Sequence, residues 1–491
     1  MIDLSADSLP EDGGGVKLPR YDRSVIRPGI VHIGVGGFHR AHQSVYMDDL
    51  MNDHGVTDWG ITGCGILPHD AAMDAVMQSQ KRRYAVVERD EHKDSVRVIG
   101  SIIRYLFGPA NPNAIVEAMA SPETKIVSLT ITEGGYPIDH ATGAFLGDLP
   151  DIRHDLANPK APRTAFGYIA EALQRRIDEQ LPPFTVLSCD NLQSNGAVAR
   201  NSVLSYAGLR SDALAEWIDK NVPFPNCMVD RITPQTTDAH RALVRDKFGI
   251  ADAWPVVCEP FRQWVIEDRF VNGRPPLDLA GAQFVADVHP YELMKIRLLN
   301  ASHSAMGYLG YLAGYRTIDA VIKDPQFRLY IQELMDEEVT PLLQPVPGID
   351  LPNYKRTLIH RFGNPAIGDQ VLRICLDGSS KMPKFILPSI AEAVETGKPF
   401  TRLALCVAAW IRFLTGLDEN GNIIPIQDPK AERLQQAALA GRQDPRPALS
   451  LTDIFGDLGT REPFVDEVSR LLVILYNKGA HDTLRTVNER N

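Results

Sequence analysis

A segment at residues 291–303 (YELMKIRLLNASH) carries the densest group of side chains that could perform acid–base chemistry, with Lys295 near its centre. A regular α-helix turns about 100° per residue, which places Glu292, His303 and Asn300 at about 60°, 80° and 140° from this lysine. Four polar groups therefore share one side of a helix that is otherwise rich in Leu, Met, Ile and Ala.

Lysine and histidine in such apolar surroundings indicate a group that is either paired or used, because burying them without a partner is costly. Desolvation lowers the pKa of a lysine towards neutrality, which would let Lys295 act as a general base. In the structural alternative, Glu292 and Lys295 form an i,i+3 surface pair and His303 belongs to the core. The residue types alone leave both interpretations open.

Tyr291 and Lys295 also match the YxxxK pair of short-chain dehydrogenases. We reject that interpretation, because those enzymes are much shorter chains and carry the pair inside the nucleotide-binding unit. Here the pair follows the domain boundary that we predict below.

A glycine-rich turn, GVGGFHRAH, directly follows a predicted strand and opens a predicted helix, which is the context of a dinucleotide-binding fingerprint. Its first glycine permits the tight turn, and its second lets the backbone approach a pyrophosphate at the positive end of the helix. His39 replaces the usual third glycine, so the motif by itself also fits a plain strand-to-helix turn. We predict a coenzyme-binding turn that includes Gly34, Gly36, Gly37 and Phe38.

The second part of that fingerprint is an acidic residue after the next strand, which bonds the ribose hydroxyls of the adenosine. Asp70 is the candidate, although it lies later than the usual spacing and would serve equally well as a helix N-cap. Between Gly63 and Ala71 the sequence has no arginine that could receive a 2′-phosphate. The pattern therefore favours NAD over NADP.

Other polar residues follow predicted strands or turns. SCDN, which ends at Asn191, comes directly after a buried strand, and MVDRITP contains Asp230. Strand ends of a doubly wound sheet face the ligand crevice, so both are candidate site residues, although each could also be a turn or cap residue. The same holds for Arg373 and Lys381, whose loop DGSSKMPK is typical of a strained or ligand-facing turn.

The elements that must position these residues fall into two groups. Strands are predicted at residues 30–33, 59–66, 85–88, 96–102, 125–132 and 184–189, with helices up to about residue 52 and at 70–79 and 164–174. This alternation indicates an α/β, Rossmann-type domain with a largely parallel sheet. Helical patterns then dominate at 291–314, 325–338, 384–396, 402–417, 430–440 and 467–477. We predict a dinucleotide-binding domain at 1–285 and a mostly α-helical substrate and catalytic domain at 286–491.

The composition excludes several classes of protein. The 491 residues include 51 Lys and Arg against 62 Asp and Glu, a net charge of −11, so the chain lacks the basic footprint that nucleic acids and anionic membranes require. Six scattered cysteines, none in a CxxC pair, predict small buried residues rather than a zinc or redox site. With neither a signal peptide nor a long apolar run, we expect a soluble, cytoplasmic protein.

Five motifs in this order resemble the polyol-specific long-chain dehydrogenase/reductase family. They are GxGGFHRAH, TITEGGY, SCDN, MVDRITP and KxxLLNxSH, and the likeness runs over nearly the whole chain. The resemblance implies a metal-independent, NAD-dependent interconversion of a polyol and a ketose, with D-mannitol and D-fructose as the expected pair. It also implies a monomer, because many members of the family are monomeric.

The resemblance assigns roles to matching residues. The lysine matching Lys295 is the general base that takes the hydroxyl proton. The asparagines matching Asn191 and Asn300 bond the developing alkoxide oxygen, an oxyanion-hole role. The histidine matching His303 bonds a neighbouring hydroxyl and helps to place the base. The residues matching Asp230, Arg373 and Lys381 bind the other hydroxyls of the substrate. Those matching Glu133 and Glu292 lie on a proton path.

Two alternatives remain open. The first keeps the chemistry and changes the substrate to D-arabinitol, sorbitol or a uronate such as fructuronate; a basic group facing the terminal carbon would favour the uronate. The second is a catalytically silent Rossmann-type binding protein, against which the intact set Lys295, Asn300 and His303 argues.

Overall fold

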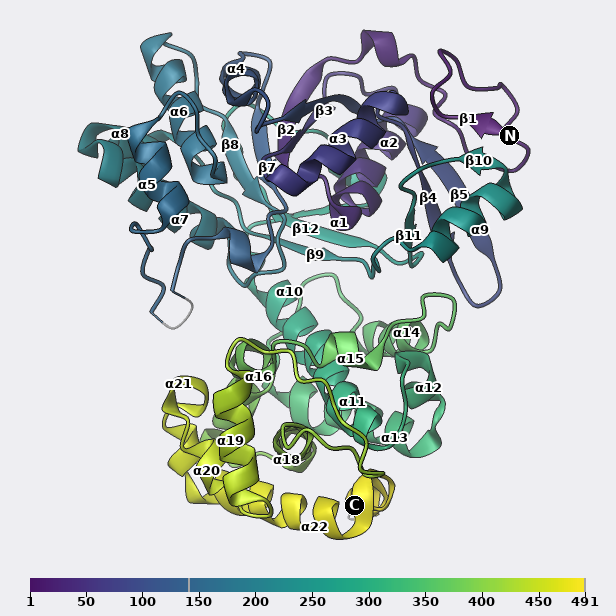
Figure 1. Cartoon of the computed structure of the whole chain (residues 1–491), viewed down its shortest axis with the longest axis vertical. Coiled ribbons are helices and arrows are strands. Elements are labelled where there is room, and N and C mark those ends of the chain that lie inside the picture. Colours follow the sequence, from purple (N-terminus) through teal and green to yellow (C-terminus); the bar gives the residue numbers. More distant parts are fainter. Residues whose placement is uncertain (140–141, 490–491) are drawn as a thin grey trace. The chain divides into compact units, whose positions relative to one another are not determined.

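The computed structural model describes residues 1–139 and 142–489. The chain divides into two compact units, Met1–Val288 and His289–Asn491 (Figure 1). The first is an α/β unit and the second consists mostly of helices, so the predicted fold class is confirmed.

Within its described residues, the unit Met1–Val288 contains a five-stranded parallel sheet (Figure 1). From edge to edge its strands are β6 (Ile102–Phe107), β3 (Gly60–Gly65), β2 (Pro28–Ile33), β7 (Ile126–Leu129) and β8 (Thr185–Ser188). Numbered in chain order within this sheet, the arrangement is 3-2-1-4-5, the strand order of the Rossmann fold. Its switch point, where the winding reverses, lies between β2 and β7.

Successive residues of the central strand β2 pack into two different cores, because side chains alternate across a strand. Ile30 belongs to one apolar cluster and Val31 to the other, on the opposite face of the sheet. The first cluster includes residues of α2 (Gln43–His54) and α3 (Ala71–Ser79). The second includes residues of α4 (Pro112–Ala120), α6 (Ala165–Asp178) and α7 (Asn195–Arg210).

Smaller sheets complete this unit. One joins β11 (Val256–Cys258), β4 (Tyr84–Arg89) and β5 (Asp94–Ile99); another joins β13 (Gln283–Val285), β12 (Gln263–Glu267) and β9 (Cys227–Asp230); a third pairs β1 (Ile2–Asp3) with β10 (Ile250–Ala251). The remaining helices are α1 (Gly37–Ala41), α5 (Pro150–Ala157), α8 (Asp212–Asn221) and α9 (Asp238–Phe248).

Three predicted elements of this unit differ from the structure. The strand predicted at 96–102 ends at Ile99, and β6 begins at Ile102 in a different sheet. Between them the Gly100 amide donates to Asp48 Oδ1, which turns the chain. The strand predicted at 125–132 ends at Leu129, and the helix predicted after the glycine turn is interrupted at His42, where φ is −118° and ψ is −89°.

The unit His289–Asn491 is a set of helices, in which α18 contacts α11 and α22. Its helices are α10 (His289–Met294), α11 (Ala301–Leu312), α12 (Ile318–Lys323), α13 (Pro325–Glu333), α14 (Leu351–Phe362), α15 (Val371–Ile374), α16 (Gly378–Phe385), α17 (Leu387–Thr396), α18 (Thr401–Phe413), α19 (Ala431–Gly441), α20 (Arg446–Leu449), α21 (Thr452–Phe455) and α22 (Glu462–Asn488). The helices predicted at 291–314 and 325–338 each contain a π-helical segment, Lys295–Asn300 and Leu334–Val339.

All six cysteines are buried, as predicted, and all six are free thiols. Among the described residues, no helix is both long and apolar enough to cross a membrane.

Candidate functional site

A cavity of about 860 Å³ opens at the carboxyl ends of the central strands of the parallel sheet. Its walls include Gly34 and Gly36 after β2, Asp70 after β3, and Thr130 to Thr132 after β7. In doubly wound sheets ligands bind at this edge, next to the switch point, and the volume is in the range of small-molecule sites.

Gly34 is required by the backbone at this turn. Its φ is +94°, and a Cβ atom there would lie 2.1 Å from the carbonyl oxygen of Thr130. Gly36 is the N-cap of α1, and the nearest atom to a Cβ placed on it would be 4.0 Å away, so the turn is open on that side. Gly37 and Phe38 are outside the cavity wall, and the Phe38 ring stacks on His42 at 4.8 Å.

Three buried histidines support the glycine turn. The His32 ring bonds Thr130 Oγ1 at 2.9 Å and stacks on His39 at 3.5 Å between ring centroids. Thr130 in turn donates to the carbonyl oxygen of Gly34 at 2.6 Å. Burial lowers the pKa of His32 and of His42 to about 3, and the pKa of His39 well below its ordinary value. These imidazoles are therefore neutral at pH 7.

Asp70 lines the cavity with its side chain 26% exposed. One carboxylate oxygen, Oδ2, accepts from the amide of Leu67 at 2.9 Å, which fixes the turn after β3. The other, Oδ1, lies 3.8 Å from Nε2 of the exposed His69. The carboxylate is thus fixed in orientation yet accessible from solvent.

The segment after β7 has an unusual backbone. Thr132 has φ +64° and ψ 168°, a region that side chains rarely adopt and that costs on the order of 1–3 kcal/mol. Thr132 and Gly134 line the cavity, whereas the partly buried Glu133 between them is not part of its wall. Asn191, exposed, follows the neighbouring strand β8. Asp190 joins these two segments, a contact that motif reasoning missed although the residue stands inside SCDN.

Asp230 is the last residue of β9 and is buried. The next residue, Arg231, connects the MVDRITP motif to the glycine turn, because its Nη1 donates to the carbonyl oxygen of Ala41 at 2.6 Å. Its Nε donates to the Glu259 carbonyl and its Nη2 pairs with Glu88. Apart from its place in the motif, nothing in the sequence marks this arginine.

In the unit His289–Asn491, the predicted polar helix carries its residues on three consecutive elements. Glu292 is on α10, Lys295 and Asn300 are the first and last residues of the π-helical segment, and His303 is on α11. The first three are buried, and the half-buried His303 packs its ring 4.7 Å from that of Phe362. A surface pair of Glu292 and Lys295, one of the two predicted interpretations, is therefore wrong.

The π-helical segment changes the predicted geometry. The estimate of about 140° between Lys295 and Asn300 assumed a regular α-helix. A π-turn closes after five residues rather than four, so Asn300 returns to nearly the same side as Lys295. Single π-turns within α-helices are frequent at functional sites.

Arg373 and Lys381 are on the neighbouring helices α15 and α16, both of which contact α11. The Arg373 guanidinium makes two parallel hydrogen bonds of 2.7 Å to Asp369, with half of its side chain exposed. Lys381 Nζ donates to the carbonyl oxygen of Ile374 at 3.0 Å. The positive charge of Arg373 is thus compensated within its own unit.

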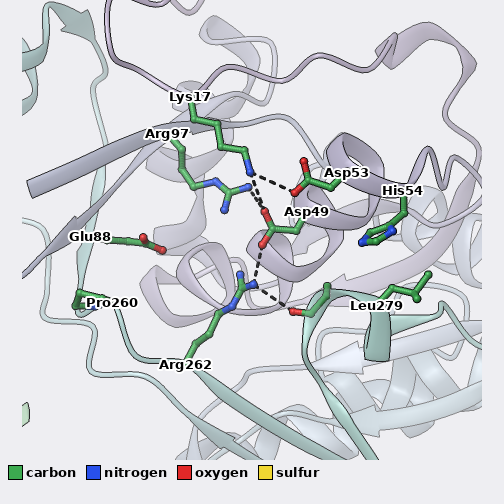
Figure 2. Close-up of a pocket in the computed structure, with 10 residues that line it drawn as sticks. Lys17, Asp49, Asp53, His54, Glu88, Arg97, Pro260, Arg262 and Leu279 are labelled. Atoms are coloured by element: carbon green, nitrogen blue, oxygen red, sulfur yellow. Dashed lines mark hydrogen bonds and ion pairs between the residues drawn. The ribbon is translucent and has the colours of Figure 1, made fainter. Parts of the chain in front are cut away.

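A second cavity, of about 440 Å³ in the unit Met1–Val288, is lined by charged side chains that pair with one another (Figure 2). Asp49 on α2 accepts from Lys17, Arg97 and Arg262 at 3.4, 2.6 and 2.7 Å. Burial raises the pKa of Asp49, but the two guanidinium groups outweigh it and lower this pKa to about 2. Because these charges satisfy one another, we assign this network a structural role.

Comparison with known proteins agrees with this architecture. The mannitol dehydrogenase Rossmann domain matches residues 28–279, and the mannitol dehydrogenase C-terminal domain matches residues 287–475. A mannitol 2-dehydrogenase of Neosartorya fischeri is 49% identical over 96% of this chain and 95% of its own length.

Two solved structures are also similar over nearly the whole chain. Pseudomonas fluorescens mannitol 2-dehydrogenase, in a ternary complex with NAD and D-mannitol, has a TM-score of 0.89 and 48% identity, covering 97% of each chain. A D-sorbitol dehydrogenase in substrate-free form has a TM-score of 0.89 and 38% identity, covering 96% of this chain and 97% of its own. The resemblance inferred from the motifs is confirmed, and the chain belongs to the mannitol dehydrogenase family.

Proposed function

We propose that this chain oxidises D-mannitol to D-fructose with NAD as coenzyme. The observation that carries the proposal is the likeness, over 97% of both chains, to a mannitol 2-dehydrogenase captured with NAD and D-mannitol. The motif residues of both units support it, because Gly34 and Gly36 stand at an open turn after β2 and Lys295 is a buried lysine.

The residues at the 860 Å³ cavity fit a dinucleotide. The open side of the turn at Gly36 leaves room for a pyrophosphate next to backbone amides. The oriented carboxylate of Asp70 would accept hydrogen bonds from the hydroxyls of the adenosine ribose. It would also repel a 2′-phosphate, which favours NAD over NADP. When bound, NAD supplies the hydride acceptor for the substrate carbon.

Lys295 is the proposed general base. As the C–H bond at carbon 2 gives up its hydride, the hydroxyl proton passes to Lys295 Nζ and the C–O bond becomes a carbonyl. A buried lysine suits this task, because desolvation favours its neutral form. We propose that the π-helical segment, which begins at Lys295, places the Asn300 amide so that it donates a hydrogen bond to the same substrate oxygen.

The proposed oxyanion donors are the side-chain amides of Asn191 and Asn300, which would stabilise negative charge on that oxygen as the proton leaves. His303 would bond the neighbouring hydroxyl and help to place the base. We further propose that the other hydroxyls are bound by Asp230, Arg373 and Lys381. A proton path to solvent would include Glu133 and Glu292. The coenzyme would be bound by the turn that contains Gly34, Gly36, Gly37 and Phe38.

We assign coenzyme binding to residues 1–285 and the catalytic base to residues 286–491. We propose a monomer in the cytoplasm, whose partners are the polyol, the ketose and the coenzyme, with neither nucleic acid nor membrane among them.

Among other substrates, the likeness to a D-sorbitol dehydrogenase favours sorbitol as the second candidate. A uronate is disfavoured, because the Arg373 guanidinium is already neutralised by Asp369. The test is NADH formation at mildly alkaline pH with D-mannitol, sorbitol and D-arabinitol, and NADH consumption in the reverse direction with fructuronate. D-Mannitol is expected to give the highest kcat/KM, and a higher value for any other substrate would overturn the assignment. Inactivity towards all of them would favour a silent binding protein.

A further inference from the structure

The carboxylate of Asp190 joins the two polar segments that follow β7 and β8. It accepts three hydrogen bonds from the first segment: from the Thr132 amide at 2.7 Å, the Ile131 amide at 3.2 Å and the Tyr136 hydroxyl at 2.7 Å. Asp190 itself follows the neighbouring strand and is only 5% exposed. The Asp190 side chain therefore bonds residues on both sides of Glu133.

The backbone that Asp190 holds is one that would otherwise relax. Thr132 is β-branched, yet its φ of +64° and ψ of 168° lie in a region that is nearly restricted to glycine. The amide of Thr132 and that of Ile131 before it both donate to the Asp190 carboxylate. Loss of this carboxylate would free the peptide before Glu133 to return to an ordinary conformation and would change the direction of the glutamate side chain.

The main chain of Asp190 is fixed from the other side. Its carbonyl oxygen accepts from Asn195 Nδ2 at 3.0 Å, and the same amide donates to the carbonyl oxygen of Cys227 at 2.8 Å. Asn195 Oδ1 accepts from the Cys227 amide at 2.9 Å. Cys227 begins β9, the strand that ends at Asp230, so the residue before Asn191 is bonded to the segments on both of its sides.

We propose that Asp190 is a positioning residue, which sets the conformation of the Glu133 segment and of the turn that begins at Asn191. The inference rests on the proposed roles of those two residues. The geometry is maintained against an electrostatic cost, because burial raises the pKa of the Asp190 carboxyl to about 6 although three donors lower it. The same three hydrogen bonds fix the position of the carboxylate.

The test replaces Asp190→Asn, which keeps the size of the side chain and removes an acceptor for the three donors. Asp48→Asn is the matched control, because Asp48 is also buried and accepts from a tyrosine hydroxyl, Tyr21 at 2.6 Å, and from a backbone amide, Gly100 at 3.1 Å. Asp48, however, pairs with Arg97 and belongs to the ion-pair network around Asp49. Both variants are expected to lower Tm.

Of these two variants, Asp190→Asn alone is expected to lower kcat for the polyol, by roughly tenfold or more, with KM within about threefold of the parent. Tyr136→Phe removes one donor without a buried charge change and is expected to give a smaller fall in kcat, so the test does not depend on Asp190→Asn folding. Equal kcat per folded molecule in the parent, Asp190→Asn and Tyr136→Phe would overturn the inference and leave the proposed function intact.

Amide hydrogen exchange tests the anchoring role of Asp190 separately from the proposed function, because it requires no turnover. Exchange at Ile131 and Thr132 is expected to accelerate by about tenfold or more in Asp190→Asn and to stay unchanged in Asp48→Asn. Unchanged protection in Asp190→Asn would overturn the anchoring role, whichever substrate the enzyme uses.

Discussion

Lys295 and Asn300 are the first and last residues of one π-helical segment, which brings them to nearly the same side of their helix. On an uninterrupted α-helix the same two residues would be about 140° apart. Hydrogen-bond register, rather than sequence spacing alone, therefore brings these two residues to one side of the helix.

Replacing Lys295 with alanine is expected to lower kcat for the polyol by about a hundredfold or more, because the hydroxyl proton loses its acceptor. Added primary amines are expected to restore part of the activity. The rise of kcat/KM with pH that a lysine base should give the parent is expected to disappear. Lys323→Ala is the control, because that lysine is half exposed and pairs with Asp319 on its own helix. Near-parental turnover in Lys295→Ala would contradict the mechanism.

The π-turn can be tested by changing its length by one residue. Deletion of Ile296 leaves Lys295 and the asparagine four residues apart, which on an α-helix is a rotation of only about 40°. Insertion of one alanine after Ile296 instead separates them by six residues, or about 240°. We expect the deletion to retain measurable kcat and the insertion to lose about a hundredfold or more. Equal losses at similar Tm would show that the register is not what matters.

Asp70→Ala is expected to weaken NAD binding by roughly tenfold, because the ribose hydroxyls lose a charged acceptor. The Kd is measured by quenching of protein fluorescence, which needs no substrate. NADP binding should change less or improve, since a repulsive charge is removed. Asp74→Ala, four residues later in the first turn of α3, is the control. An unchanged Kd for NAD would place the ribose elsewhere.

The buried histidines predict acid sensitivity. Their pKa values are lowered to about 3 for His32 and His42, below the ordinary 6.5 of the unfolded chain. Between these values the unfolded chain binds more protons, so the free energy of unfolding falls as the pH decreases from 6.5 towards 3 and is fully retained above 6.5. Urea unfolding at a series of pH values measures this slope, and His42→Gln should reduce it. A variant with an unchanged slope would exclude His42 as a contributor.

Much of the site follows from local sequence. Gly34 and Gly36 after a buried strand predict the coenzyme turn, and the alternation of strands and helices predicts the doubly wound sheet, because both patterns are properties of neighbouring residues. The polar residues around Lys295 identify a base for the same reason. These features require only the periodicity of side chains and the chemistry of each type.

Other features depend on partners that are distant in the chain. The carboxylate of Asp190 finds its donors near residue 132, the charge of Arg373 is cancelled by Asp369, and the strand at Ile99 ends because Gly100 donates to Asp48. Hydrogen-bond register, backbone strain and charge compensation arise only when separate segments pack together. The sequence by itself therefore determined which groups are present and on which kind of element they lie, whereas the tertiary structure decided how each is oriented and what it is paired with.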